Sequence, residues 1–163
     1  MFFALAPMDA LMRGMTGVLL LLPAFFAYAS LTTPDPEGAA LAGVGAFVVA
    51  IYGSVYFYWR PRGFAVEEGA LTLVFPIRSK RIDGIIQAER IDRAELKRRY
   101  GWQARVGAGG LWGGFGWLWS SRGWMEFYVS RMDGYVLLTR RDGLPLLISA
   151  DRPDALLAAV KPD

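Results

Sequence analysis

The chain has 163 residues, of which 54% are hydrophobic and 14% aromatic, and its formal net charge is +3. This length suits one small domain with a short anchor. There is no Cys and no His, which excludes disulfides, thiol nucleophiles, Ser-His-Asp triads and imidazole metal ligands.

Two uncharged, apolar runs lie near the start of the chain, one between Arg13 and Asp35 and one from Gly38 to Trp59. Each is long enough to cross a bilayer, which takes about 20 apolar residues. Residues 1–6 fit either a strand or an arm on the membrane surface. The runs predict an N-terminal arm over residues 1–13, then a two-helix transmembrane hairpin over 14–60 with helices at about 14–33 and 38–59.

Pro23 lies inside the first run, where we expect a kink, with neighbouring helices or local adjustments satisfying the carbonyl freed by the proline. The alternative is a cleaved signal peptide, because Ala27-Tyr28-Ala29 has the small-x-small pattern of a cleavage site. The domain that follows keeps the same orientation in either case, since the second run would stop transfer.

The charges at the ends of the two runs predict the orientation of the hairpin. The turn over residues 32–37 has no Lys or Arg, whereas Arg13, Arg60 and Arg62 flank the other ends. The positive-inside rule therefore places both termini in the cytoplasm, as in a multi-pass protein of the inner membrane.

Small residues recur every four positions along the second run, and such spacing lets helix backbones approach closely. We interpret them as the face that packs on the first helix, and a seam between two copies of the chain is the alternative. The stripe consists of Gly38, Ala42, Ala46, Ala50 and Ser54.

The residues after Arg60 predict a β-rich domain over 61–163. Glu68-Gly69, Asp133-Gly134 and Asp142-Gly143 each separate β-prone runs, which is the pattern of hairpins. Pro145 places the last strand at an edge or seam, or opens that strand. The final segment predicts a short apolar helix at about 152–160.

Residues 87–99 have helix-forming composition, with Glu and Arg four positions apart, and would be assigned as a helix from local propensity alone. Their apolar residues are sparse, however, and form no clean helical stripe.

Four segments together resemble the bacterial pleckstrin-homology-like domains that are fused to two membrane helices. The resemblance is carried by the segments 63–71, 110–119, 127–139 and 148–156. In this family a Gly-aromatic segment precedes a Tyr-containing strand, and a Pro-Asp-rich turn leads into the last helix. Here Ala150 and Arg152 stand where the commoner turn has Pro and Asp.

The resemblance implies an α+β, mainly β domain: a bent, seven-stranded antiparallel barrel, capped by the C-terminal helix and mounted on the helical membrane hairpin. It also implies that residues 87–97 form a strand, and we adopt this against the local propensity.

The segment from Gly107 to Trp124 is rich in glycine and tryptophan. It lacks the Lys-Ser/Thr of a phosphate-binding loop. Packing inside the domain is the simplest interpretation, with glycines allowing close strand approach. The functional interpretation is a membrane-interface element, because indoles prefer the headgroup level. The aromatic residues proposed for the membrane interface are Trp59, Trp112, Trp117, Trp119 and Trp124.

The segment from Arg60 to Arg105 holds 11 Lys or Arg against 6 Asp or Glu, a local excess of five. Such a basic segment beside a membrane anchor favours anionic lipid headgroups, and solvated loops are an equally good interpretation. One loop holds the same place in the order of strands as the inositide-binding loop of eukaryotic pleckstrin-homology domains. It contains Arg78, Lys80 and Arg81. The residues proposed to bind a lipid or anion are Arg78, Lys80, Arg81, Lys97, Arg98 and Arg99.

The sequence shows no catalytic constellation, no metal site and no cofactor motif, so we expect a protein that is not an enzyme. The main expectation is a membrane-anchored interaction module that binds a protein partner or the anionic bilayer surface, as a scaffold or regulator. The alternative is a structural subunit, or a homo-oligomer, assembled through the helices. No nucleic-acid motif accompanies the basic residues.

Overall fold

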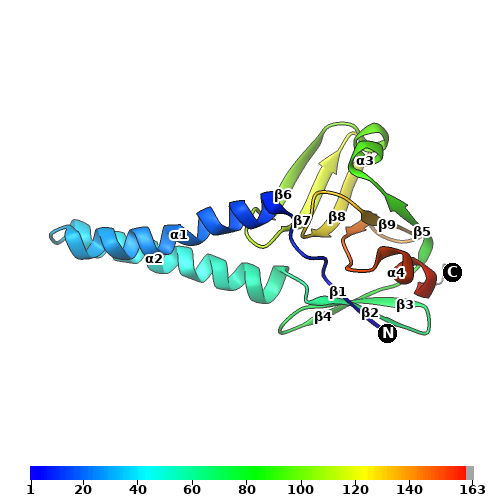
Figure 1. Ribbon diagram of the computed structural model, residues 1–163, viewed down its shortest axis with the longest axis horizontal. Helices are drawn as coiled ribbons and strands as arrows, with labels where there is room; N and C mark the ends of the chain where they lie inside the picture. Colours follow the sequence, from blue (N-terminus) through cyan, green and yellow to red (C-terminus); the bar gives the residue numbers. More distant parts are fainter. Residues whose placement is uncertain (161–163) are drawn as a thin grey trace.

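The structure, a computed structural model, describes residues 1–160. A long apolar helical hairpin projects from one end of the domain (Figure 1). In chain order the elements are β1 (Phe2–Ala4), α1 (Ala10–Thr32), α2 (Glu37–Ser54), the π-helical turn η1 (Val55–Trp59), β2 (Gly63–Glu67), β3 (Ala70–Val74), β4 (Ser79–Ile82), β5 (Ile85–Ile91), α3 (Arg93–Tyr100), β6 (Gln103–Gly109), β7 (Gly114–Ser120), β8 (Gly123–Val129), β9 (Tyr135–Arg140), β10 (Leu146–Ile148) and α4 (Pro153–Ala159). Within residues 1–160 the domain consists of two sheets and the two short helices α3 and α4.

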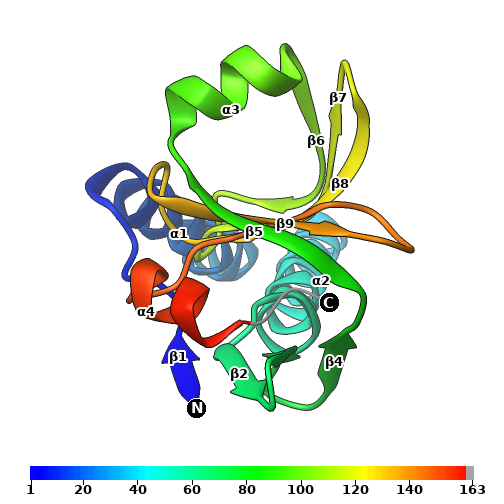
Figure 2. The ribbon, with the colours of Figure 1, turned by 90° about the vertical axis from the view of Figure 1, so that its right-hand side faces the viewer.

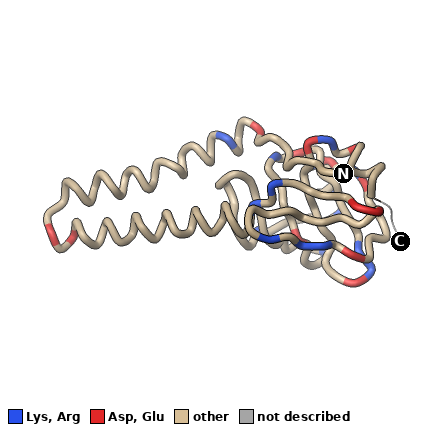
Figure 3. The backbone as a smooth tube through the Cα atoms, turned by 90° about the horizontal axis from the view of Figure 1, so that it is seen from below, with Lys and Arg blue, Asp and Glu red and all other residues tan. Residues whose placement is uncertain are grey.

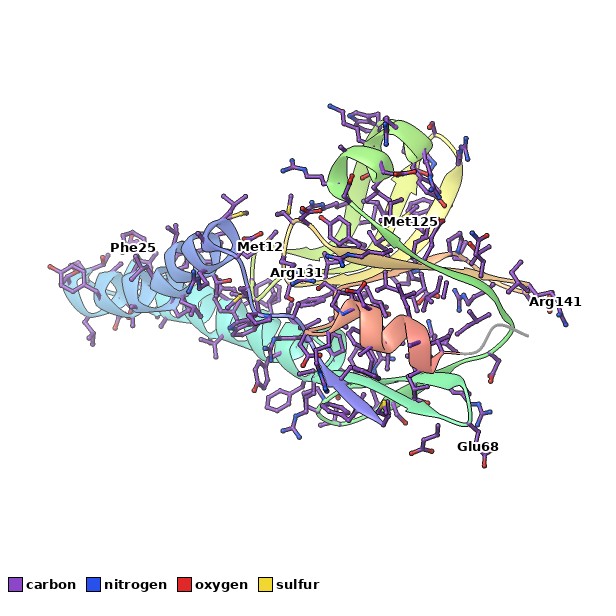
Figure 4. All side chains as sticks on the ribbon, turned by 45° about the vertical axis from the view of Figure 1, so that its right-hand side comes forward. Met12, Phe25, Glu68, Met125, Arg131 and Arg141 are labelled. Atoms are coloured by element: carbon purple, nitrogen blue, oxygen red, sulfur yellow. The ribbon has the colours of Figure 1, made fainter. Side chains whose placement is uncertain are left out.

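Two helices, Ala10–Thr32 and Glu37–Trp59, are long and apolar enough to cross a membrane, as predicted. Neither carries a charged side chain over its central length, and acidic residues mark the far loop while basic residues lie at the ends near the domain (Figure 3). Most of their apolar side chains are exposed, including Phe25 on the distal half of α1 (Figure 4).

The two helices pack through faces with heptad spacing, which is the pattern of an antiparallel coiled-coil pair. The contact face consists of Leu19, Pro23, Phe26 and Ser30 on α1 and of Gly38, Leu41, Gly45, Val48 and Tyr52 on α2, all buried or half-buried. The same spacing continues at the domain end through Met12, Thr16 and Val55, where Thr16 bonds to the β6–β7 turn and Val55 belongs to the domain core. Gly45 is a point of close approach between the helices, since a Cβ there would lie 3.0 Å from Cβ of Phe26.

The stripe of small residues is not this contact face. Gly38 is buried, but Ala42, Ala46, Ala50 and Ser54 are exposed. The predicted packing of these four residues on the first helix is therefore wrong, because a four-residue repeat drifts around the helix whereas alternating steps of three and four residues follow one face. The other interpretation, a seam between two copies, stays a prediction.

A hydrogen bond between the helices compensates for Pro23, which is one of the two ways expected from the sequence. Proline has no N–H to donate to the carbonyl of Leu19, four residues earlier. The hydroxyl of Tyr52 on α2 donates to that carbonyl at 2.7 Å. The backbone group freed by the proline is thus satisfied by the partner helix.

The domain contains two sheets rather than a closed barrel, so the predicted seven-stranded barrel is wrong. One sheet has the order β1-β2-β3-β4, and the other has the order β5-β9-β10-β8-β7-β6. Among the strand pairs of residues 1–160, only β10–β8 is parallel. Figure 2 shows the view along the hairpin axis, in which β6, β7 and β8 extend sideways beyond the helices.

The larger sheet is covered on both faces. Phe64, Leu73, Phe115 and Leu138 belong to a core shared with the smaller sheet, and Leu156 of α4 fills its end. A second, smaller core on the opposite face packs beneath α3. Met125 lies on that side, close to α3 (Figure 4).

The first residues of the chain join the two sheets. β1 pairs with β2, and Leu5 then forms a bridge with Ala150. The Ala6 amide donates to the carbonyl of Ser149 at 3.0 Å. Of the two alternatives for residues 1–6, a strand or an arm on the membrane surface, the structure shows the strand. Cleavage after Ala29, as in the signal-peptide alternative, would remove this strand and the join that it makes.

Two predictions of local structure are corrected. Residues 85–91 form strand β5, but Asp92 caps α3 at Arg93, accepting from the Glu95 amide at 2.7 Å. The predicted strand over 87–97 is therefore right only in its first half. The Asp133-Gly134 turn does not join paired strands, because β10 lies between β8 and β9. Pro145 directly precedes β10, as one of the predicted alternatives had it.

Candidate functional site

The start of α1 is held against the domain by two polar side chains. Asp9 caps the helix, accepting from the Met12 amide at 2.8 Å, and its other oxygen accepts from the Met132 amide at 2.8 Å. Thr16 is buried, and its hydroxyl accepts from the Trp112 amide and donates to the carbonyl of Gly110, each at 2.9 Å. The turn between β6 and β7 is thereby fastened to the hairpin.

We expect Thr16→Val to destabilise the domain by about 2 kcal/mol, because the isosteric side chain leaves the Trp112 amide and the Gly110 carbonyl without their partner. The measurement is thermal unfolding of the full chain in mild detergent, followed by near-ultraviolet circular dichroism. Thr32→Val is the matched control, since the exposed Thr32 hydroxyl bonds only to carbonyls of its own helix. Equal melting of the two variants would contradict this role for Thr16.

Four tryptophans form an aromatic row that begins at the end of the hairpin, and we define it as Trp59, Trp117, Trp119 and Trp124. The rings of Trp59 and Trp117 meet edge to face at 5.5 Å, and those of Trp119 and Trp124 lie 6.4 Å apart. Trp117, Trp119 and Trp124 are 41%, 48% and 46% exposed. The row thus leads from η1 onto the outer part of β7 and β8.

The alternation of side chains along β7 explains why the aromatic row is exposed. Phe115, Trp117 and Trp119 point to the same face of the sheet, because side chains two positions apart share a face. Phe115 is fully buried in the main core, whereas the two tryptophans farther along β7 are exposed. Exposed indoles on adjacent strands make an apolar patch of the kind that marks a binding surface.

Trp102 and Trp112 differ from the row. Trp102 precedes β6, is 70% exposed and contacts Trp119 at 6.1 Å, so it extends the patch around the sheet edge. It was missed in the sequence because it lies outside the glycine-rich segment. Trp112, in contrast, is half-buried against Tyr56 with a backbone φ of 59°.

The first predicted basic cluster is divided among separate contacts. Arg78 donates to the carbonyl of Tyr58 at 2.8 Å, next to the end of the hairpin. Lys80 forms an ion pair with Glu126, and exposed Arg81 pairs with Asp83 at 2.8 Å. Within residues 1–160, these three cations therefore do not converge on one anion site.

The second cluster lies on α3, away from the first. Arg99 pairs with Glu89 and Glu95, each at 2.6 Å, and Arg98 pairs with Glu95 at 3.3 Å. Lys97 is exposed and has no ion pair among the residues that the structure describes. Of this cluster, only Lys97 thus has its charge free for a ligand.

Glu126 is an important charged residue that sequence reasoning missed. It is 8% exposed, lies opposite Trp117 in the sheet, and accepts from Lys80 and from Arg140, the latter at 3.0 Å. Burial raises its pKa, but the hydrogen bonds from Lys80 and Arg140 outweigh this and lower it overall. Glu126 therefore stays ionised and holds β4, β8 and β9 together.

Within residues 1–160, no group of three carboxylates is placed so that it could hold a metal ion. The expectation that the chain is not an enzyme and needs no cofactor stays a prediction. A scan against protein-family models, a search of curated proteins and a search of solved structures each found no match for this chain.

Proposed function

We propose that the protein is a membrane-anchored module that binds the surface of the bilayer in which it sits. The hairpin α1–α2 is the anchor, and the aromatic row is the binding surface. The observation that supports this proposal best is the continuity of the row with the hairpin, through the contact of Trp59 with Trp117.

The distribution of charge supports an orientation with the domain in the cytoplasm. Arg13, Arg60, Arg62 and Arg78 lie at the domain end of the hairpin, whereas the far turn carries acidic residues and no cation (Figure 3). Cytoplasmic flanks of membrane helices are enriched in Lys and Arg. The same cations favour the anionic cytoplasmic leaflet.

The shape of the domain favours contact between the aromatic row and the bilayer. Strands β6–β8 extend sideways from the hairpin (Figure 2), so the row runs outward from the point where the helices end. Indole rings are amphipathic and concentrate at the headgroup level. Asp9 and Thr16 fix the domain against the hairpin, so the indole rings are already held beside the bilayer. Their contact with lipid therefore requires no further loss of conformational entropy.

The test is tryptophan fluorescence of the full chain in bilayers whose lipids carry bromine near the top of the acyl chain. We expect the emission contributed by Trp119 and Trp124, obtained as the difference from Trp119→Phe and Trp124→Phe variants, to be quenched by the brominated lipid. Both residues are exposed, so both variants should fold. Trp112 is the internal reference, because it lies against Tyr56 on the hairpin.

Emission from Trp119 and Trp124 that ignores the brominated lipid, yet is quenched by acrylamide from the water phase, would refute the proposal. Protection from both quenchers would instead indicate a protein partner on the row, which is the other expectation drawn from the sequence.

A further inference from the structure

A cavity of about 280 Å³ lies beneath α3, on the face of the larger sheet opposite the main core. Its floor is apolar and comes from three strands and the helix, through Leu96, Leu118, Phe127 and Leu147. The helix has only eight residues, and Leu96 is its one fully covered apolar side chain. One leucine does not fill the space over three strands, which leaves a hollow close to the size of small-ligand sites.

The rim of this cavity is basic. Arg93 and Lys97 are four positions apart on α3 and therefore share a face, and Arg105 comes from β6. None of the three forms an ion pair within the described residues 1–160, and the cavity lining includes no carboxylate. Their neighbours Arg98 and Arg99, in contrast, are both paired with glutamates.

Two carboxylates, Asp92 and Asp133, lie in an adjoining open hollow that shares Arg93 and Lys97, and each accepts backbone hydrogen bonds that leave its negative charge in place. Asp92 accepts from the Glu95 amide at 2.7 Å, and Asp133 accepts from the Gly134 amide at 2.7 Å. The three cations Arg93, Lys97 and Arg105 therefore stand against two carboxylates, and these five side chains keep a net charge of +1.

Tyr135 adds a neutral donor to the cavity. It is 4% exposed and lines the cavity, and its hydroxyl has no hydrogen-bond partner in the part of the chain that the structure describes. Burial raises the pKa of Tyr135 to about 12, against the opposing effect of Arg105 and Arg93. The hydroxyl thus keeps its proton at neutral pH and can donate to an anion.

We propose that this cavity binds a single amphipathic anion, with its apolar tail on the floor and its carboxylate or phosphate head among Arg93, Lys97 and Arg105. A cavity with an apolar floor and a cationic rim is complementary to such a molecule in both shape and charge. The source is either a free acyl carboxylate from the water phase or a single-chain phospholipid from the bilayer. The cavity lies on the face of the sheet opposite Trp117 and Trp119 and adjoins the aromatic row through the contact of Trp102 with Trp119. This inference does not depend on the proposed function, because it rests on the cavity floor and its cationic rim.

The experiment uses the full chain in nanodiscs of zwitterionic lipid, with decanoate as the probe and decanol as its uncharged counterpart. Trp102 lines the cavity, so its emission reports occupancy. We expect saturable binding of decanoate at least about tenfold tighter than that of decanol, because hydrogen bonds to a charged head add this much affinity. Decanol binding as tightly as decanoate, or no saturable binding of either, would overturn the proposal.

Variants distinguish binding of decanoate in the cavity from its partition into the bilayer. We expect Arg105→Gln to weaken decanoate binding by about tenfold and Tyr135→Phe by about threefold. Arg141→Gln removes the same charge at an exposed turn away from α3 (Figure 4) and should bind like the wild type. If Arg105→Gln also binds like the wild type, the cationic rim is not a binding site.

A second titration uses lysophosphatidic acid incorporated in the nanodiscs, with decanoate as competitor. Displacement of decanoate at low lipid content supports the bilayer as the source. Failure of the lipid to compete, with decanoate still bound, supports a free carboxylate. Both results keep the cavity as an anion site, and neither changes the outcome of the bromine-quenching test, which is run without decanoate.

Discussion

Replacing Glu126 by glutamine is expected to destabilise the β domain by about 3–5 kcal/mol, which is the usual cost of removing one partner from a buried ion pair. The side chain of Arg140 is only 9% exposed and its charge is compensated by Glu126. Lys80 on the other sheet depends on the same carboxylate. Chemical denaturation of the full chain in detergent measures the loss.

A double replacement distinguishes a charge effect from a packing effect. Glu126→Leu combined with Arg140→Met removes both buried charges, and we expect it to recover much of the stability lost in Glu126→Gln. Arg81→Gln is the control, because its pair with Asp83 is exposed and screened by solvent, so this variant should unfold close to the wild type. A Glu126→Gln variant as stable as Arg81→Gln would contradict the assigned role.

The lowered pKa of Glu126 gives this pair a defined dependence on pH. A carboxyl group whose pKa is lower in the folded state contributes stability above its unfolded pKa, about 4.3 for glutamate. That contribution is lost as the pH falls through the lower pKa of the folded state. Stability should therefore decline below about pH 4 in the wild type, and Glu126→Gln should lack this part of the decline.

Replacing Gly116 by alanine is expected to destabilise the domain by at least about 3 kcal/mol. Gly116 on β7 faces Gly107 on β6, and each has a φ of 133°. A Cβ at Gly116 would lie 2.5 Å from the carbonyl oxygen of Val106 and 3.1 Å from Cα of Gly107. The cost therefore combines a strained backbone with a collision against backbone atoms that have little freedom to move.

Gly109→Ala is the matched control for this prediction. Gly109 lies two residues after Gly107 on the same strand, and a Cβ there would meet nothing within 4 Å. We expect this variant to melt within a few degrees of the wild type, because only the small propensity difference remains. A loss in Gly109→Ala equal to that in Gly116→Ala would show that close approach of β6 and β7 is not the cause.

The helical hairpin could be predicted from the sequence because it depends on composition and length alone. Its contact face was missed, although the signal was present, since Leu41, Gly45, Val48 and Tyr52 follow heptad spacing. A repeat of small residues is easier to see than a heptad of mixed sizes. The sequence predicts that some group satisfies the carbonyl freed by Pro23. It could not identify Tyr52 as the donor, because that depends on the register of the two helices.

The order of strands in the larger sheet could not be predicted from turn signals. Asp133-Gly134 is a local pattern, and a local pattern does not exclude a third strand between its neighbours. The run Leu146–Ile148 carried a better signal, since three consecutive apolar residues indicate a strand buried on both faces and thus a central one. The residues of the cavity rim are separated in sequence, so only the fold brings Arg105 beside Lys97.

The start of α3 shows how a resemblance can override a correct local signal. Asp92 followed by Glu95 has the spacing of a helix N-terminus, and the structure begins the helix there. The expectation of a continuous strand came from the likeness to a barrel family, and the two-sheet architecture does not require it. Local propensity was the better guide after residue 92.

The hydrogen bond from Tyr52 to Leu19 has a consequence for how the hairpin enters a bilayer. Alone in hydrocarbon, α1 would hold an unsatisfied carbonyl, which costs several kcal/mol. Its donor lies on α2, 33 residues later in the chain. In the proposed membrane anchor, α1 would therefore gain this hydrogen bond only once α2 has emerged during synthesis, and we expect the two helices to leave the translocation channel together as a pair.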